Sequence, residues 1–173
     1  MTVTWNTLGD PDVSVGRELP DTEIRIDEDV PGGGEGVGEV VARGPQIMLG
    51  YYRNPEATAA VLDADGWLKT GDLGQMDEGR NLHIRGRLKE LIIHGGFNVY
   101  PPEVEAALNE HPKVIQCAVI GMMEGGDEKV VAFVQVSPDN RPDEADLRAF
   151  AAERLAGYKR PSRIIIAEDL PAA

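Results

Sequence analysis

Cysteine, histidine and basic residues are scarce in this 173-residue sequence, and each scarcity excludes a class of site. Cys117 is the only cysteine, so an internal disulfide and a multi-cysteine metal site are both excluded, and a reducing, cytoplasmic compartment is favoured. The three histidines, His83, His94 and His111, have no carboxylate or histidine at ligand spacing in the sequence. We therefore predict no bound metal, surface or interface positions for the histidines, and a buried Cys117 within an apolar strand.

Basic residues are outnumbered by acidic ones, 17 to 30, which gives a formal net charge of −13. Nucleic-acid binding needs clustered cations against phosphates, so the charge argues against a general nucleic-acid binder, and no nucleic-acid partner is predicted. No stretch approaches the ~20 consecutive apolar residues that a membrane-spanning helix requires. The first ten residues have neither the basic start nor the apolar run of a signal peptide, so no leader is predicted.

The charge is distributed unevenly along the chain. Residues 1–79 contain 16 acids and 5 bases, a net charge of −11, whereas residues 80–173 contain 14 acids and 12 bases, a net charge of −2. This shift predicts two structural units with different surfaces. The second part opens with four close cations, which are Arg80, Arg85, Arg87 and Lys89. They could hold a compact anion such as a nucleotide, or they could be solvated side chains on an exposed strand.

The first half of the sequence has the pattern of a β-rich region. Alternating polarity and turn residues predict strands at residues 13–15, 23–26, 39–43, 67–72 and 82–85. A short helix is predicted from Ala57 to Leu62, because Asn54 suits the N-cap and Pro55 the first helical position. Trp67 is interpreted as a packing residue.

After Gly86 the pattern changes to strands that alternate with helices. Strands are predicted at residues 91–93, 114–120, 130–136 and 163–167. One helix starts at Pro101, and a second covers residues 143–156, with Pro142 at its first position and Gly157 at its C-terminal cap. The predicted fold class is α+β: a β-rich part followed by a small sheet with helices on one face.

Three consecutive segments carry a resemblance to a known family. They are GPQIMLGYY at residues 44–52, DGWLKTGD at residues 65–72, and GRLKELI with GGFNVYPPEVE at residues 86–92 and 95–105. This set resembles the C-terminal third of the adenylate-forming superfamily, and most of all the acyl-CoA synthetases. The superfamily also includes nonribosomal peptide adenylation domains and firefly-type luciferases. A more variable family segment resembles LAGYKRP at residues 155–161.

The resemblance implies a two-step reaction and two domains. In such enzymes a carboxylic acid attacks ATP to give an acyl-adenylate, and a thiol, commonly that of coenzyme A, then displaces AMP. Residues 1–86 would be the β-rich C-terminal part of the large domain, and residues 87–173 the mobile lid domain. ATP or AMP, Mg²⁺ and coenzyme A are implied as ligands of the parent enzyme. The acid and coenzyme A would reach it through an N-terminal domain outside this sequence.

The resemblance also implies a nucleotide site. Asp72 ends a strand at a Thr-Gly-Asp turn, where its carboxylate can accept hydrogen bonds from both ribose hydroxyls or cap its own turn. Arg87 matches the family arginine that contacts the ribose and phosphate side of the adenylate; the alternative is a surface ion pair. Ile84 could lie against the adenine face or pack in the core.

Two further features are implied for the change between the half-reactions. Lys89 matches the family hinge position, which absorbs a large change of backbone dihedrals; the alternative is an ordinary exposed lysine. Gly95 and Gly96 match the loop beside the pantetheine tunnel. They could equally form a positive-φ turn before the helix at Pro101, and the two roles are compatible.

The sequence departs from the family at the residues that do the chemistry. It contains no glycine-rich phosphate loop with a lysine, no Thr-Glu pair, and no Gly-Lys dipeptide after Leu170 and Pro171, and neither Lys129 nor Lys159 replaces that lysine. We therefore assign no catalytic residue and expect a ligase fragment, inactive alone, that binds no cofactor tightly. A carrier-loading adenylation domain or a non-catalytic nucleotide-binding or interaction module stays open, as does a homodimer.

Overall fold

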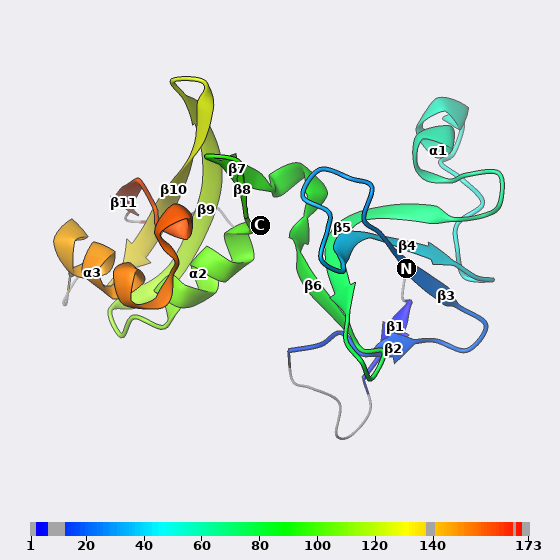
Figure 1. Cartoon of the computed structure of the whole chain (residues 1–173), viewed down its shortest axis with the longest axis horizontal. Coiled ribbons are helices and arrows are strands. Elements are labelled where there is room, and N and C mark those ends of the chain that lie inside the picture. The colour runs from blue at the N-terminus through cyan, green and yellow to red at the C-terminus, as the bar shows by residue number, and fades with distance from the viewer. Residues whose placement is uncertain (1–2, 7–12, 138–140, 168, 171–173) are drawn as a thin grey trace. The chain divides into compact units, whose positions relative to one another are not determined.

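The computed structural model describes residues 3–6, 13–137, 141–167 and 169–170 (Figure 1). It divides into two compact units, Met1–Lys89 and Glu90–Ala173. The border lies three residues beyond the one that the family resemblance implies, and the roles implied for the two parts stay predictions. The four close cations belong to the first unit, whose 16 acids and 9 bases give −7, against −6 for the 14 acids and 8 bases of the second. Two units are present, but their net charges are similar, so the change in charge after Gly79 does not mark the border between them.

The first unit is built on a four-stranded antiparallel sheet of order β3-β4-β5-β6. Its strands are β3 (Glu23–Asp27), β4 (Val37–Arg43), β5 (Leu68–Met76) and β6 (Leu82–Arg87), and two short strands, β1 (Thr4–Trp5) and β2 (Arg17–Glu18), pair beside it. The predicted strand at residues 13–15 does not form, although the Val15 amide donates to the Leu82 carbonyl at 2.8 Å. Ile24, Val40 and Leu82 make up the centre of the core.

Local capping explains the helix between β4 and β5. α1 (Pro55–Val61) begins after Asn54, whose Oδ1 accepts a hydrogen bond from the Ala57 amide at 3.0 Å. Trp67 is buried, and the guanidinium groups of Arg25 and Arg43 lie 4.0 and 4.7 Å from the centre of its ring. The helix cap and the packing role of Trp67 are both confirmed.

The second unit combines a hairpin, a three-stranded sheet and two helices. Its elements are β7 (Ile92–His94), β8 (Phe97–Val99), α2 (Pro101–Asn109), β9 (Val114–Glu124), β10 (Asp127–Val136), α3 (Glu144–Arg154) and β11 (Arg163–Ala167), with short 3-10 turns at Leu88–Glu90 and Gly157–Lys159. β10 pairs antiparallel with β9 and parallel with β11. Both helices contribute side chains to one core with β10, so the α+β class with helices on one face is confirmed.

Two details of the second unit differ from the sequence prediction. β8 was not predicted, because its three residues are too few to show a period. α3 begins later than expected: Asp143 is the N-cap, and its Oδ1 accepts the Asp146 amide at 2.7 Å. The helix ends at Arg154 with an extended Leu155, so Gly157 is not its cap. No helix in the described ranges has the length and apolar character needed to cross a membrane.

Candidate functional site

The Thr-Gly-Asp segment bulges out of strand β5. Glu39 on β4 lies opposite Leu73, and Val41 lies opposite Lys69, so the single residue Val40 faces three residues, 70–72. Such an insertion breaks the regular ladder of backbone hydrogen bonds and redirects the side chains within it. Gly71 adopts φ +76°, a conformation that L side chains rarely adopt.

Side chains replace the ladder bonds that the bulge removes. The Thr70 hydroxyl donates to the Val40 carbonyl at 2.7 Å and accepts from the Asp72 amide at 3.1 Å. The Gly71 amide donates to Oε1 of Glu39 at 3.0 Å, and Glu39 is buried, with 5% of its surface exposed. The side chain that bonds within this turn is therefore that of Thr70, not that of Asp72.

Asp72 and Arg87 lie directly opposite each other on β5 and β6. Nε of Arg87 is 3.1 Å from Oδ1 of Asp72, and the two side chains are 56% and 33% exposed. An exposed pair of this kind contributes only ~0–1 kcal/mol to stability. The structure thus brings together the two residues predicted for the ribose and phosphate, in a contact that does little for the fold.

Ile84 and Lys89 are both exposed side chains of the first unit. Ile84 is 41% exposed on β6, three residues before Arg87, so the alternative of core packing is wrong. Lys89 lies in the 3-10 turn Leu88–Glu90, and the border between the two compact units follows it directly.

Gly95 and Gly96 form the two-residue turn between β7 and β8. Their φ angles are +59° and +81°, and a Cβ added at either position would meet no atom within 4 Å. The positive-φ turn predicted as one of their two roles is confirmed. The Gly95 amide donates to Oδ1 of Asp127 at 2.9 Å, which ties the turn to the start of β10.

Comparisons with known proteins identify the family of the chain. A family model described as the AMP-binding enzyme C-terminal domain matches residues 103–173. The chain belongs to the adenylate-forming superfamily.

Several proteins similar to this chain are named as coenzyme A ligases. The 3-[(3aS,4S,7aS)-7a-methyl-1,5-dioxo-octahydro-1H-inden-4-yl]propanoyl:CoA ligase of Mycobacterium tuberculosis is 45% identical over 90% of this chain and 29% of the relative. The 2-succinylbenzoate–CoA ligase of Geobacillus kaustophilus is 44% identical over 91% of this chain and 32% of the relative. ATP-bound MatB from Rhodopseudomonas palustris matches with a TM-score of 0.85 and 37% identity, covering 95% of this chain and 34% of that one. The chain therefore spans about a third of the length of these proteins.

The acyl-CoA ligase resemblance did not reveal the residues that hold the glycine turn. Nδ1 of His94 lies 2.9 Å from Oδ2 of Asp127, and Nζ of Lys129 lies 2.9 Å from the same oxygen. The hydrogen bond from the Gly95 amide, followed by the one from Lys129, lowers the pKa of Asp127 to about 2. Oε2 of Glu128 accepts the Ile93 amide at 2.5 Å. Asp127, Glu128 and Lys129 lie more than 30 residues from the turn in the sequence, which is why no local motif revealed them.

In the structure each of the three histidines has a carboxylate neighbour. His83 lies 3.1 Å from a carboxylate oxygen of Asp77, and His111 lies 3.7 Å from one of Asp146. His111 is also buried rather than on the surface, with its ring edge-on to Phe150. Each carboxylate is distant in sequence or across a turn, so ligand spacing in the sequence could not show it. Across the described ranges, no group of three or more His, Cys, Asp or Glu could hold a metal ion.

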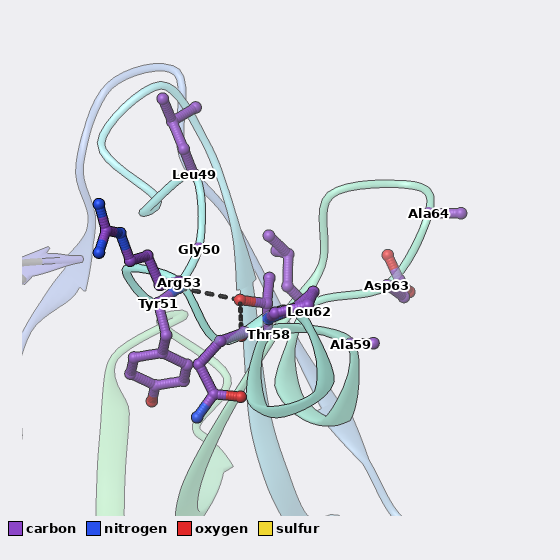
Figure 2. Close-up of a pocket in the computed structure, with 11 residues that line it drawn as sticks. Leu49, Gly50, Tyr51, Arg53, Thr58, Ala59, Leu62, Asp63 and Ala64 are labelled. Carbon is purple, nitrogen blue, oxygen red and sulfur yellow. Dashed lines mark hydrogen bonds between the residues drawn. The ribbon is translucent and has the colours of Figure 1, made fainter.

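A pocket of about 550 Å³ lies beside α1 (Figure 2). The Thr58 hydroxyl accepts from the Tyr51 amide at 2.9 Å and donates to the Asn54 carbonyl at 2.8 Å, and Leu49 is fully exposed at the rim. None of the residues predicted to bind nucleotide lines this pocket. The resemblance to adenylate-forming enzymes therefore assigns it no ligand.

Proposed function

We propose that the first unit holds the ribose and phosphate of AMP and of an acyl-adenylate in an ATP-dependent acid–thiol ligase. The observation that carries the proposal is the pair of Asp72 and Arg87, which face each other across β5 and β6 at 3.1 Å. Relatives that are CoA ligases, and a similar structure with ATP bound, support a nucleotide as the ligand. Asp72 accepts from the ribose hydroxyls, and Ile84 lies against the adenine.

Arg87 can serve the nucleotide while it contacts Asp72. A guanidinium has five N–H donors in a planar fork, and the contact with Asp72 involves Nε. The ion pair fixes the plane of the guanidinium, and its remaining donors suit a phosphate oxygen. The cation then offsets charge on the phosphate while the carboxylate orients the sugar. No step is assigned to Mg²⁺, because the described residues hold no cluster of metal ligands.

The remaining proposed residues act when the reaction changes from adenylation to thioester formation. Lys89 is proposed as the hinge, supported by the unit border that follows it. Gly95 and Gly96 are proposed to lie beside the pantetheine arm, supported by the open space around their Cα atoms, which lets a ligand approach the backbone. Coenzyme A is the favoured acceptor over a carrier protein, because the relatives are named as CoA ligases.

The test is a titration of AMP into the ¹⁵N-labelled 173-residue chain, followed by NMR. Asp72→Ala is expected to weaken binding by about 10-fold or more, since a hydrogen bond to a charged group is worth ~1.5–3 kcal/mol. 2′,3′-Dideoxy-AMP should bind the wild type as weakly as AMP binds the variant. Asp65→Ala, an exposed aspartate of a nearby turn, is the matched control. Equal AMP affinities of wild type and Asp72→Ala would reject the site.

The chain alone is expected to lack adenylation activity. The phosphate-cradling loop and the lysine that face the reacting phosphates in the family are not among its residues. Carboxylate-dependent exchange of pyrophosphate into ATP should be absent with pure chain. Robust exchange with any carboxylic acid would contradict this part of the proposal.

A further inference from the structure

We propose that Glu39 and Thr70 are positioning residues that hold the carboxylate of Asp72 beside Arg87. This inference rests on the proposed nucleotide role of Asp72, and it adds two side chains that need not touch the nucleotide. Both lie on the strands that form the bulge, Glu39 on β4 and Thr70 on β5. Their hydrogen bonds fix the residue before Asp72 and the backbone of Asp72 itself.

The bulge makes such support necessary. Val40 faces three residues of β5, so ordinary strand pairing does not define the direction of the Asp72 side chain. Gly71 at φ +76° has no atom within 4 Å of an ideal Cβ position, so side-chain packing does not define it either. Hydrogen bonds from neighbouring side chains are what remains to hold the segment.

Glu39 supplies one of these bonds at a cost to folding. A glutamate is rarely as buried as this one, at 5% exposure, because a charged group loses its hydration there. An apolar residue on the central strand β4 would serve the core better. The bond that Oε1 makes at 3.0 Å is to the amide of Gly71, the residue with the least conformational restriction in the bulge. The placement of Glu39 is thus explained by the conformation of the bulge.

Thr70 fixes the two sides of the bulge with one hydroxyl. It donates to the Val40 carbonyl across the strands and accepts from the Asp72 amide along the chain. The hydroxyl therefore sets the backbone of Asp72 relative to β4. With Glu39 bonded to the intervening glycine, the three residues have one arrangement, in which Oδ1 of Asp72 lies 3.1 Å from Nε of Arg87.

The experiment compares isosteric and deleting variants of the whole chain. Thr70→Val removes the hydroxyl and keeps the shape, while Thr70→Ser keeps the hydroxyl; Glu39→Ala removes the acceptor, while Glu39→Gln keeps a carbonyl oxygen. Glu56→Ala is the control, because Glu56 lies exposed on α1 of the same unit. The readouts are hydrogen-exchange rates of the Gly71 and Asp72 amides and of the Arg87 Nε–H, together with the affinity for AMP.

We expect the two deleting variants to speed exchange of the Gly71 and Asp72 amides and of the Arg87 Nε–H by about 10-fold or more, and to weaken AMP binding by about 10-fold. The serine and glutamine variants should restore both within about 3-fold. Unchanged exchange at all three groups in folded Thr70→Val and Glu39→Ala would overturn the proposal. If Glu39→Ala does not fold, Thr70→Val alone decides, since it leaves no cavity.

The outcomes separate this inference from the proposed function. Suppose that Asp72→Ala leaves AMP binding unchanged while Thr70→Val speeds exchange at Asp72 and Arg87. The nucleotide role then fails, and the positioning of Asp72 stands. If Asp72→Ala weakens AMP binding but Thr70→Val and Glu39→Ala leave it unchanged, the nucleotide role stands and the positioning role is rejected.

Discussion

Each of the two units holds a glycine of positive φ by a hydrogen bond from its amide to a carboxylate on another strand. In the first unit the Gly71 amide donates to Glu39 at 3.0 Å, and in the second the Gly95 amide donates to Asp127 at 2.9 Å. The surroundings differ, because Glu39 is 5% exposed while the side chain of Asp127 is 31% exposed and lies beside Lys129 and His94.

The difference shows two ways to keep a flexible turn in one conformation. A buried acceptor has no competing water, so its hydrogen bond is strong and insensitive to salt. An exposed acceptor competes with water and depends on neighbouring cations, which salt screens and acid neutralises. We expect the bulge at Gly71 to be the more permanent of the two and the turn at Gly95 to respond to conditions.

The largest effect that tests this comparison concerns Cys117. Burial, and secondarily the nearby charge of Glu105, raise the pKa of Cys117 to about 12, from 9.0. In the folded chain, alkylation by iodoacetamide at pH 8 should be ~1000-fold slower than in urea, because the thiolate is that much scarcer. Alkylation rates against urea concentration thus report unfolding of the second unit. Cys117 is half-buried rather than buried as predicted, so rapid alkylation without denaturant would mean that its thiolate is not depleted in the folded chain, and alkylation would then not follow this unit.

The next largest effect is expected from removing Glu39, the buried acceptor of the Gly71 amide. Glu39→Ala should lower the free energy of unfolding of the first unit by about 2–3 kcal/mol, since it leaves the Gly71 amide without its partner and opens a cavity. Both tryptophans, Trp5 and Trp67, belong to this unit, so their fluorescence in urea measures it separately. Glu56→Ala, at an exposed position of α1, should stay within ~0.5 kcal/mol of wild type. A loss no larger than that of this control would show that burial does not strengthen the bond.

Replacing either glycine by alanine is expected to destabilise its unit by a smaller amount, and by a similar amount in the two units. Gly71→Ala and Gly95→Ala should each destabilise their own unit by about 1–2 kcal/mol, because alanine resists positive φ while its Cβ would meet no atom in either place. Gly95→Asn should recover most of the loss, since asparagine tolerates this conformation. Tryptophan fluorescence measures the unfolding of the first unit, and Cys117 alkylation measures that of the second. If only one of the two alanine variants were destabilised, the two turns would not be held in their conformations in the same way.

The smallest expected effect is the part of the pH dependence of stability that comes from Asp127. Its pKa is about 2 in the folded chain and 3.8 as an ordinary side chain, so its stabilisation is present above about pH 4 and is lost as the pH falls toward 2. The advantage of wild type over Asp127→Asn in urea midpoint, followed by Cys117 alkylation after a return to pH 8, should shrink between pH 4 and 2. An advantage that stays constant across this range would show that the charge of Asp127 is not what holds Gly95.

The sequence predicted elements whose signals are local. Asn54 before Pro55 predicted the start of α1, and alternating polarity predicted β3 and β4. The bulge could not be predicted, because it depends on the register between β4 and β5. The strand expected at residues 13–15 does not form, although its polarity alternates. The Val15 amide donates to the Leu82 carbonyl, but this contact is not extended into a strand.

The sequence predicted those residues of the candidate site that belong to a family motif. The resemblance placed Asp72 and Arg87 at one site, and the structure brings their side chains together, while their role toward a nucleotide stays a proposal. Asp127 was missed because 32 residues separate it from Gly95. Glu39 was missed because sequence patterns treat a charged residue in a strand as a solvent-facing one.

The parallel pairing of β11 with β10 sets the order in which the two units can be completed on the ribosome. The sheet of the first unit joins its four strands in chain order, so each strand meets its partner as soon as it has been made. In the second unit Val131 pairs with Arg163, and Ile164 from β11 fills the core. That core therefore stays open, with apolar side chains accessible to chaperones, until β11 has left the exit tunnel.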